Sequence, residues 1–124
     1  LSALLSDADP AVRYEAVEAL RKLGDIKVLG RLISALGDES TDVRYGAIQA
    51  LRTLGDKRAV EPLVRICFEN EDLRVYALEA IKELCGEESL KPVLEALSEM
   101  QVLIHQISVR VLNLRDKSSQ RASS

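Results

Sequence analysis

The chain has 124 residues, of which 47% are hydrophobic and 30% are charged, with three Tyr, one Phe and no Trp. This length suffices for one domain with a real core, and the scarcity of aromatic residues argues against a β-sandwich. The net charge of −3 argues against a protein whose main task is to bind nucleic acid. No apolar run approaches the roughly 20 residues of a membrane span and no signal-peptide pattern is present, so we expect a cytoplasmic location and no membrane partner, with a nuclear location left open.

The first residues, Leu1–Asp7 (LSALLSD), match Leu32–Asp38 (LISALGD) and so predict the end of a helix whose preceding partner is missing. The chain starts without Met, which we expect of a piece of a larger protein or of a processed chain. Terminal units of a repeat protein normally need a polar cap. We therefore expect the apolar edge at Leu1, Leu4 and Leu5 to be covered by further sequence or to be used in self-association.

The first segment with a clear helical pattern is Val12–Leu23, in which apolar residues recur on one helical face. Asp9 suits the N-cap position, and Pro10 suits the first helical position, where its missing N–H costs nothing. Gly24 follows the last apolar residue, as helix-ending glycines do. The pattern predicts an amphipathic helix that cannot bury its apolar stripe alone.

This helix recurs along the chain. The segment Ala11–Asp25, AVRYEAVEALRKLGD, returns at Asp42–Asp56 as DVRYGAIQALRTLGD and at Leu73–Gly86 as LRVYALEAIKELCG. A fourth, divergent copy occupies Leu103–Leu114. Repetition at a fixed period is the sequence signature of repeat architectures, so we expect each copy to form an equivalent helix.

A second set of similar segments lies between these copies, at Ile26–Leu36, Lys57–Cys67 and Glu87–Leu97. Pro62 and Pro92 are tolerated only near the first turn of a helix, so two of these helices should start close to Arg58 and Ser89. The chain is thus an alternation of two helical segments. Stacked pairs of this kind build a continuous core in which each pair touches only its neighbours.

The segments Asp9–Asp25 and Ala59–Ile66, DPAVRYEAVEALRKLGD and AVEPLVRI, resemble the HEAT repeat family in its short, phycobilisome-lyase-like form. The resemblance covers nearly all of residues 1–114. It implies an all-α, armadillo-like helical fold: a right-handed α-solenoid, or α-α superhelix, of about three and a half HEAT-like repeats and seven or eight helices. We expect residues 1–114 to form this repeat domain, open to continuation in a longer solenoid. The polar, Ser-rich residues 115–124 are expected to form a disordered tail.

One family feature transfers residue by residue. HEAT repeats resemble one another in an Asp placed before a Val-Arg motif and in the Arg itself, and these residues form a charged ladder along the stack. The matching residues here are Asp7 with Arg13, Asp38 with Arg44, and Arg74, whose Asp is replaced by Phe68. We expect these residues to be structural.

The resemblance also implies that the Val-Arg helices line the concave surface, where a partner would bind. All three tyrosines of the chain fall at these positions, and tyrosine is enriched at interfaces. An alternative is that each ring covers the core of a neighbouring repeat. The candidate partner-binding residues are Tyr14, Glu15, Glu18, Tyr45, Gly46, Gln49, Val75, Tyr76, Glu79 and His105.

Enzymatic sites known on this scaffold find no counterpart in the sequence. The di-iron site of HEAT-like hydroxylases needs His-Glu pairs, whereas the single histidine, His105, is followed by Gln106. Cys67 and Cys85 form no CxxC pair, and no Ser/His/Asp spacing or glycine-rich phosphate loop is present. We therefore predict no catalytic, cofactor-binding or metal-ligating residues and no cofactor.

The sequence favours a non-enzymatic scaffold that presents a concave helical surface to a protein or peptide partner. The acidic residues near this surface, Glu15, Glu18, Glu79 and Glu83, suggest a partner with basic features. They are partly offset by Arg21, Arg52 and Lys82, and the alternative is a mixed, solvated face. Two alternatives stay open: a phycobilin-lyase-like or chaperone-like module acting on a bound protein, and a regulatory repeat segment of a larger complex or enzyme.

Overall fold

The computed structural model describes the backbone of residues 3–123 and the side chains of residues 3–114. Within residues 3–123 it contains no strand, and it consists of six α-helices and four short 3-10 helices. The α-helices are α1 (Pro10–Leu23), α2 (Leu29–Ala35), α3 (Thr41–Leu54), α4 (Val60–Glu69), α5 (Arg74–Cys85) and α6 (Leu90–Ser123). The 3-10 helices are η1 (Leu4–Ser6), η2 (Ile26–Val28), η3 (Lys57–Ala59) and η4 (Glu87–Ser89). The predicted all-α class is confirmed.

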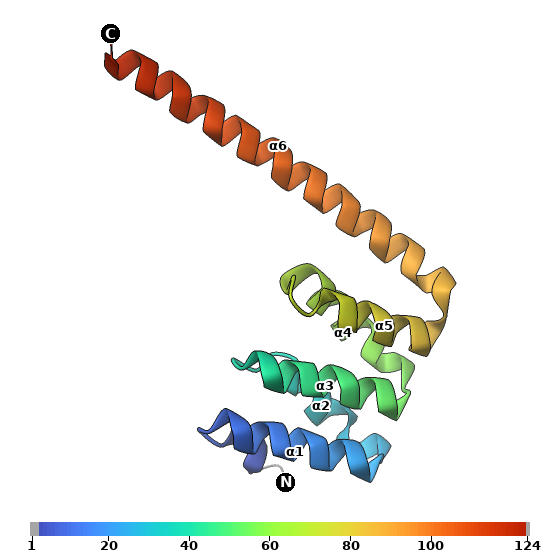
Figure 1. Cartoon of the computed structure of the whole chain (residues 1–124). Coiled ribbons are helices and arrows are strands. Elements are labelled where there is room, and N and C mark those ends of the chain that lie inside the picture. Colours follow the sequence, from blue (N-terminus) through green and yellow to red (C-terminus); the bar gives the residue numbers. More distant parts are fainter. Residues whose placement is uncertain (1–2, 124) are drawn as a thin grey trace. The chain divides into compact units, whose positions relative to one another are not determined.

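The chain divides into two units, Leu1–Lys91 and Pro92–Ser124. In the first unit α1, α3 and α5 lie side by side in chain order, while α2 packs against α3 and α4 packs against α5 (Figure 1). The helices that carry the repeated Val-Arg pattern thus form one row, and α2 and α4 lie behind it. This is the arrangement of a helical solenoid, in which each helix pair contacts its neighbours in sequence.

The helix boundaries of the first repeat follow from local chemistry. The Asp9 carboxylate accepts a hydrogen bond of 2.9 Å from the Ala11 N–H, and Pro10 is the first helical residue. Gly24 ends α1 with a φ of 61°, a left-handed conformation that costs glycine least. Gly55 ends α3 in the same way, with a φ of 75°. The predicted caps and stops are therefore confirmed.

The second set of helices starts where the prolines require. Helix α4 begins at Val60 after the 3-10 turn η3, so Pro62 lies in its first turn. Helix α6 begins at Leu90 after η4, and Pro92 likewise lies in its first turn. The N–H groups of the first turn of a helix have no intrahelical acceptor. The missing N–H of proline therefore costs nothing at either position.

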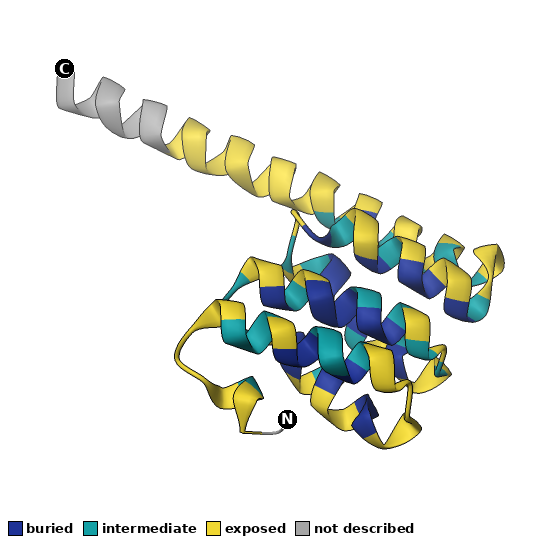
Figure 2. Cartoon of the chain, turned by 60° about the horizontal axis from the view of Figure 1, so that its bottom comes forward, coloured by how far each residue is buried: buried dark blue, intermediate teal, exposed yellow. Residues whose placement is uncertain are grey.

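The core of the first unit consists of aliphatic side chains from both sets of helices (Figure 2). Ala16, Ala47 and Ala77 occupy equivalent positions of α1, α3 and α5, and each is at most 2% exposed. Their small side chains allow neighbouring helices to approach closely. The largest fully buried side chains of this unit are Val17, Leu20, Leu32, Val43, Ile48, Leu51, Leu63, Cys67 and Ile81.

The C-terminal part differs from the prediction. The sequence predicts separate helices at Glu87–Leu97 and Leu103–Leu114, but α6 runs without a break from Leu90 to Ser123. The earlier connection at residues 37–40 contains Gly37 and Asp38, whereas residues 98–101 (SEMQ) contain no Gly, Pro, Asn or Asp. Without such a breaker the two predicted helices fuse, and the expected total of seven or eight helices is too high for residues 3–123.

Two predictions at the chain ends are untested. Helix α6 includes most of residues 115–124, but their side chains lie outside the described residues, and the disordered tail stays a prediction. At the other end, Leu4 and Leu5 belong to a single 3-10 turn, and Leu4 is exposed. Leu1 lies outside the described residues, and self-association through this edge stays a prediction.

Candidate functional site

The three tyrosines lie at equivalent positions of α1, α3 and α5. Tyr45 and Tyr76 touch edge to face, with ring centroids 4.9 Å apart and an interplanar angle of 82°. This geometry suits two aromatic rings, whose edges are electropositive and whose faces are electronegative. Both rings remain accessible, with exposed fractions of 36% and 40%. We call the surface formed by Tyr14, Tyr45 and Tyr76 the tyrosine face.

Gly46 makes room for the third ring. A Cβ atom at this buried position would lie 3.1 Å from Cε2 and 3.3 Å from Cδ2 of Tyr14, closer than ordinary van der Waals contact. Tyr14 of α1 thus rests on the backbone of α3, and its ring is half-buried. A glycine in mid-helix costs about 1 kcal/mol relative to alanine, so its presence here has a packing reason.

A pair of glycine substitutions tests this explanation. Gly30 of α2 has no atom within 4 Å of its ideal Cβ position, so Gly30→Ala should stabilise the chain by about 0.5–1 kcal/mol. Gly46→Ala should gain clearly less, because the Tyr14 ring must move to admit the methyl group. Urea unfolding of both variants measures the difference. Equal gains at the two positions would show that Tyr14 places no constraint on residue 46.

An open groove with a volume of about 550 Å³ lies beside the tyrosine face, at the amino ends of α1 and α3. Its lining residues are Asp9, Pro10, Ala11, Tyr14, Glu15, Ser40, Asp42 and Tyr45. Three of these side chains are carboxylates and none is Lys, Arg or His, so the lining side chains carry a net negative charge. We call it the acidic groove.

The structure brings only some of the predicted partner-binding residues to this groove. Tyr14, Glu15 and Tyr45 line it, whereas Glu18 is engaged in an ion pair with Arg21, with an N–O distance of 2.8 Å. Val75 and Glu79 are exposed on α5, and Gln49 is half-buried on α3. His105 is exposed on α6, outside the unit that carries the tyrosines.

Asp42 is a lining residue that the sequence analysis missed. It lies three residues before Tyr45 on α3, and side chains at this spacing share a helix face. The sequence predicts only a helix cap at Asp9, but this residue also lines the groove. A search three residues before each tyrosine of the predicted binding surface would have identified Asp42 as a further candidate.

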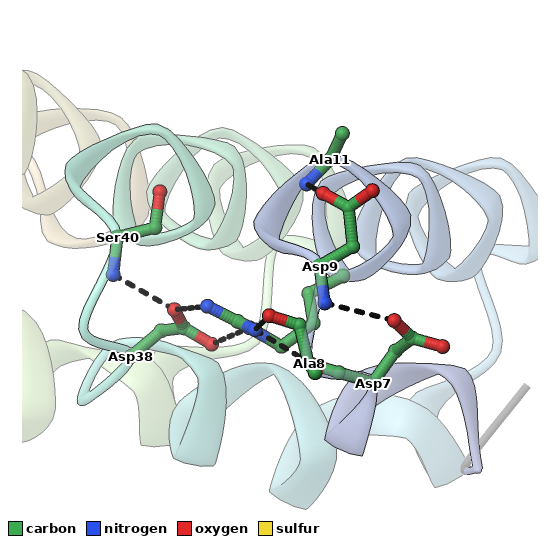
Figure 3. Close-up of polar contacts among 7 residues, drawn as sticks. Asp7, Ala8, Asp9, Ala11, Asp38 and Ser40 are labelled. Atoms are coloured by element: carbon green, nitrogen blue, oxygen red, sulfur yellow. Dashed lines mark hydrogen bonds and ion pairs between the residues drawn. The ribbon is translucent and has the colours of Figure 1, made fainter.

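The predicted charged ladder connects neighbouring repeats. Arg13 of the first repeat binds Asp38 of the second in a two-point ion pair, with Nε–Oδ2 and Nη2–Oδ1 distances of 2.9 and 3.1 Å (Figure 3). Its Nη1 donates to the backbone carbonyl of Asp7 at 2.6 Å. The Asp7 carboxylate instead accepts from the Asp9 N–H. The ion pair therefore joins the first turn of α1 to the loop before α3, rather than the two residues of one repeat.

The electrostatic state of Asp38 follows from these contacts. Burial by itself would raise the pKa of this carboxyl and is the largest single effect, but it is opposed by hydrogen bonds from Arg13 and from the Ser40 N–H. The charges of Arg13 and Arg44 act in the same direction. The net result is that the pKa of Asp38 lies below its ordinary value, so the carboxylate stays charged at neutral pH.

The ladder does not continue in the same form along the stack. Arg74 donates from Nε to the backbone carbonyl of Cys67 at 2.8 Å. Arg44 bonds to the Thr41 hydroxyl through Nη2, while its buried Nε has no hydrogen-bond partner among the described residues. Phe68 stands where the next Asp would be expected, which explains why Arg44 lacks the ion pair that Arg13 makes.

The remaining reactive groups are dispersed. Burial raises the pKa of the Cys67 thiol to about 11, so it is protonated at neutral pH and a poor nucleophile. Among the described residues, no group of three or more His, Cys, Asp and Glu side chains could hold a metal ion. No helix in that part of the chain is both long and apolar enough to cross a membrane.

Comparison with models of protein families identifies a family for most of the first unit. A family model described as HEAT repeats matches residues 1–72, which include α1 to α4 and the Arg13–Asp38 ion pair. The match supports the broad resemblance drawn from the sequence but not the narrower phycobilisome-lyase-like form, which stays a prediction. No curated protein matches the chain.

Proposed function

Because the chain belongs to the HEAT repeat family, whose members generally act as non-enzymatic scaffolds that bind proteins, we propose that its tyrosine face binds a protein or peptide partner. Fold membership alone does not choose a binding surface, so this assignment depends on the residues of the face itself.

The single observation that carries the proposal is the exposed Tyr45–Tyr76 pair next to the acidic groove. Each ring fixes its neighbour, so little side-chain entropy is left to lose when a partner binds. Tyrosine offers a large apolar surface and a polar hydroxyl, and it is enriched among the residues that dominate binding energies. The face is thus preorganised for contact.

The charge of the groove favours a particular kind of partner. Glu15 and Asp42 are exposed at the groove, and their carboxylates would attract a Lys or Arg side chain. A cation held there would also lie near the rings of Tyr14 and Tyr45, where a cation–π contact adds to the attraction. We therefore propose an extended peptide segment that carries at least one basic residue.

A peptide selection tests the proposal. Peptides chosen from a random phage-displayed library against the full chain should carry Lys or Arg. They should bind the Tyr14→Ala, Tyr45→Ala, Tyr76→Ala triple variant at least about tenfold more weakly, because the aromatic contacts are lost. Fluorescence anisotropy measures the affinities, and circular dichroism checks that the triple variant keeps its helices.

The matched control removes an exposed ion pair from the other row of helices. Glu61 and Arg65 of α4 are 3.1 Å apart and well exposed, so the Glu61→Ala, Arg65→Ala variant should bind the selected peptides as the unmodified chain does. Peptides that bind all three proteins equally would contradict the proposal, as would a selection that yields no binder.

A further inference from the structure

Helix α6 carries an unusual density of exposed apolar side chains. Between Met100 and Leu114 the exposed large apolar residues are Val102, Leu103, Ile104, Ile107, Val109, Val111, Leu112 and Leu114, with exposed fractions from 41% to 66%. The unit Pro92–Ser124 contains no other helix that could cover them. An exposed apolar surface of this kind commonly marks an interaction site.

The spacing of these residues identifies the type of partner. Apolar residues alternate at intervals of four and three along α6, at Val93, Leu97, Met100, Ile104, Ile107, Val111 and Leu114. This is the heptad pattern of a coiled coil, whose seam packs against another helix with the same spacing. The β-branched Ile104 and Val111 fall at the a positions and Leu114 falls at a d position, the combination that favours two strands, whereas Ile107 at d by itself favours a higher oligomer.

The charges of this stretch are compatible with a second identical chain. From Met100 to Leu114 the only charged side chain is that of Arg110, and no acidic residue is present. Two copies of the stretch would therefore meet without substantial like-charge repulsion. With Arg110 as its only charge, this stretch offers little to attract a strongly charged partner. The heptad spacing is therefore the feature that would select a partner.

We propose that α6 forms a two-stranded coiled coil with α6 of a second copy of this chain, through Met100, Ile104, Ile107, Val111 and Leu114. These residues span about 21 Å of helix at 1.5 Å per residue. The seam is short, so the dimer forms in a concentration-dependent manner.

The same helix supplies a matched control. Val109 is exposed like Val111 but lies two residues away, on the other side of the helix from the heptad seam. Val111→Glu and Val109→Glu make the same chemical change and add the same charge. Only the change at position 111 introduces a carboxylate into the proposed seam, where burial without a partner is costly.

Sedimentation velocity of the full chain, from about 1 μM to about 1 mM, tests the proposal. The unmodified chain and Val109→Glu should shift with concentration from the 13.7 kDa of one chain towards twice that mass. Val111→Glu should show a dissociation constant at least about tenfold higher. Circular dichroism of each variant checks that its helices are retained.

Several outcomes would overturn the proposal. These are an unmodified chain that stays monomeric throughout, a limiting mass above two chains, or equal effects of the two glutamate substitutions. If Val111→Glu loses helical structure, Ile107→Ala decides instead, since alanine is the best helix former and removes only the side-chain contact. A weaker dimer in Ile107→Ala supports the proposed seam, and an unchanged dimer overturns it.

Discussion

Replacing Leu51 by alanine should lower the free energy of unfolding by about 3 kcal/mol. Leu51 has no exposed surface and belongs to α3, which packs against α1, α2 and α5. The substitution removes buried methyl groups and leaves a cavity that the surrounding helices can fill only in part. In a stack in which each repeat is stabilised by its neighbours, a cavity in the central helix weakens several interfaces at once.

Leu23 provides the matched control, because the same substitution there affects a side chain that is 60% exposed. Urea denaturation followed by circular dichroism should show a large loss for Leu51→Ala and a small one for Leu23→Ala. Similar losses at both positions would mean that α3 is not the centre of the packed stack.

Replacing Asp38 by asparagine should destabilise the chain at neutral pH, and by more than a substitution in an exposed ion pair does. The side chains of Asp38 and Arg13 are each only 13% exposed, so their ion pair is more shielded from water than the other ion pairs among the described residues. Hydrogen bonds to charged groups contribute more than neutral ones, and asparagine removes the carboxylate that pairs with the guanidinium. The exposed Glu61–Arg65 pair is the control, and Glu61→Gln should leave the free energy of unfolding nearly unchanged.

The same substitution predicts a pH dependence of defined sign. Because the pKa of Asp38 is lowered in the folded chain, its contribution to stability is present above the unfolded value of about 3.9 and is lost as the pH falls through the folded value. The difference in unfolding free energy between the unmodified chain and Asp38→Asn should therefore shrink below about pH 4. Urea unfolding at several acidic pH values measures it. A difference that stays constant down to acid unfolding would show that the ion pair does not stabilise the fold.

The repeated pattern made the first five helices predictable from sequence. The apolar periodicity placed the helices, and Asp9, Pro10, Gly24 and Gly55 fixed boundaries through local backbone chemistry that depends on no distant residue. The same local reasoning located the starts of α4 and α6 from their prolines. Such signals are reliable because they act within one helical turn.

Two features were not predicted from the sequence. One depends on a contact between repeats, and the other on the absence of turn-forming residues. The six-residue spacing of Asp38 and Arg44 suggests a relation within one repeat, but the ion pair crosses to Arg13 because α1 and α3 lie side by side. Similarly, the repeat period predicted a turn between Leu97 and Leu103, where the residues present favour an unbroken helix. A period alone cannot reveal where a divergent copy has lost its turn.

Whether the tyrosine face binds the partner is tested most directly by hydrogen exchange of the full chain with and without a selected basic peptide. The first turns of α1 and α3 lie at helix ends, where local opening needs the least free energy, so protection by a ligand is easy to detect there. Binding at the acidic groove should slow exchange in residues 9–15 and 40–45 and leave α2 and α4 unchanged. Protection confined to α2, α4 or α6 would contradict the proposed binding surface.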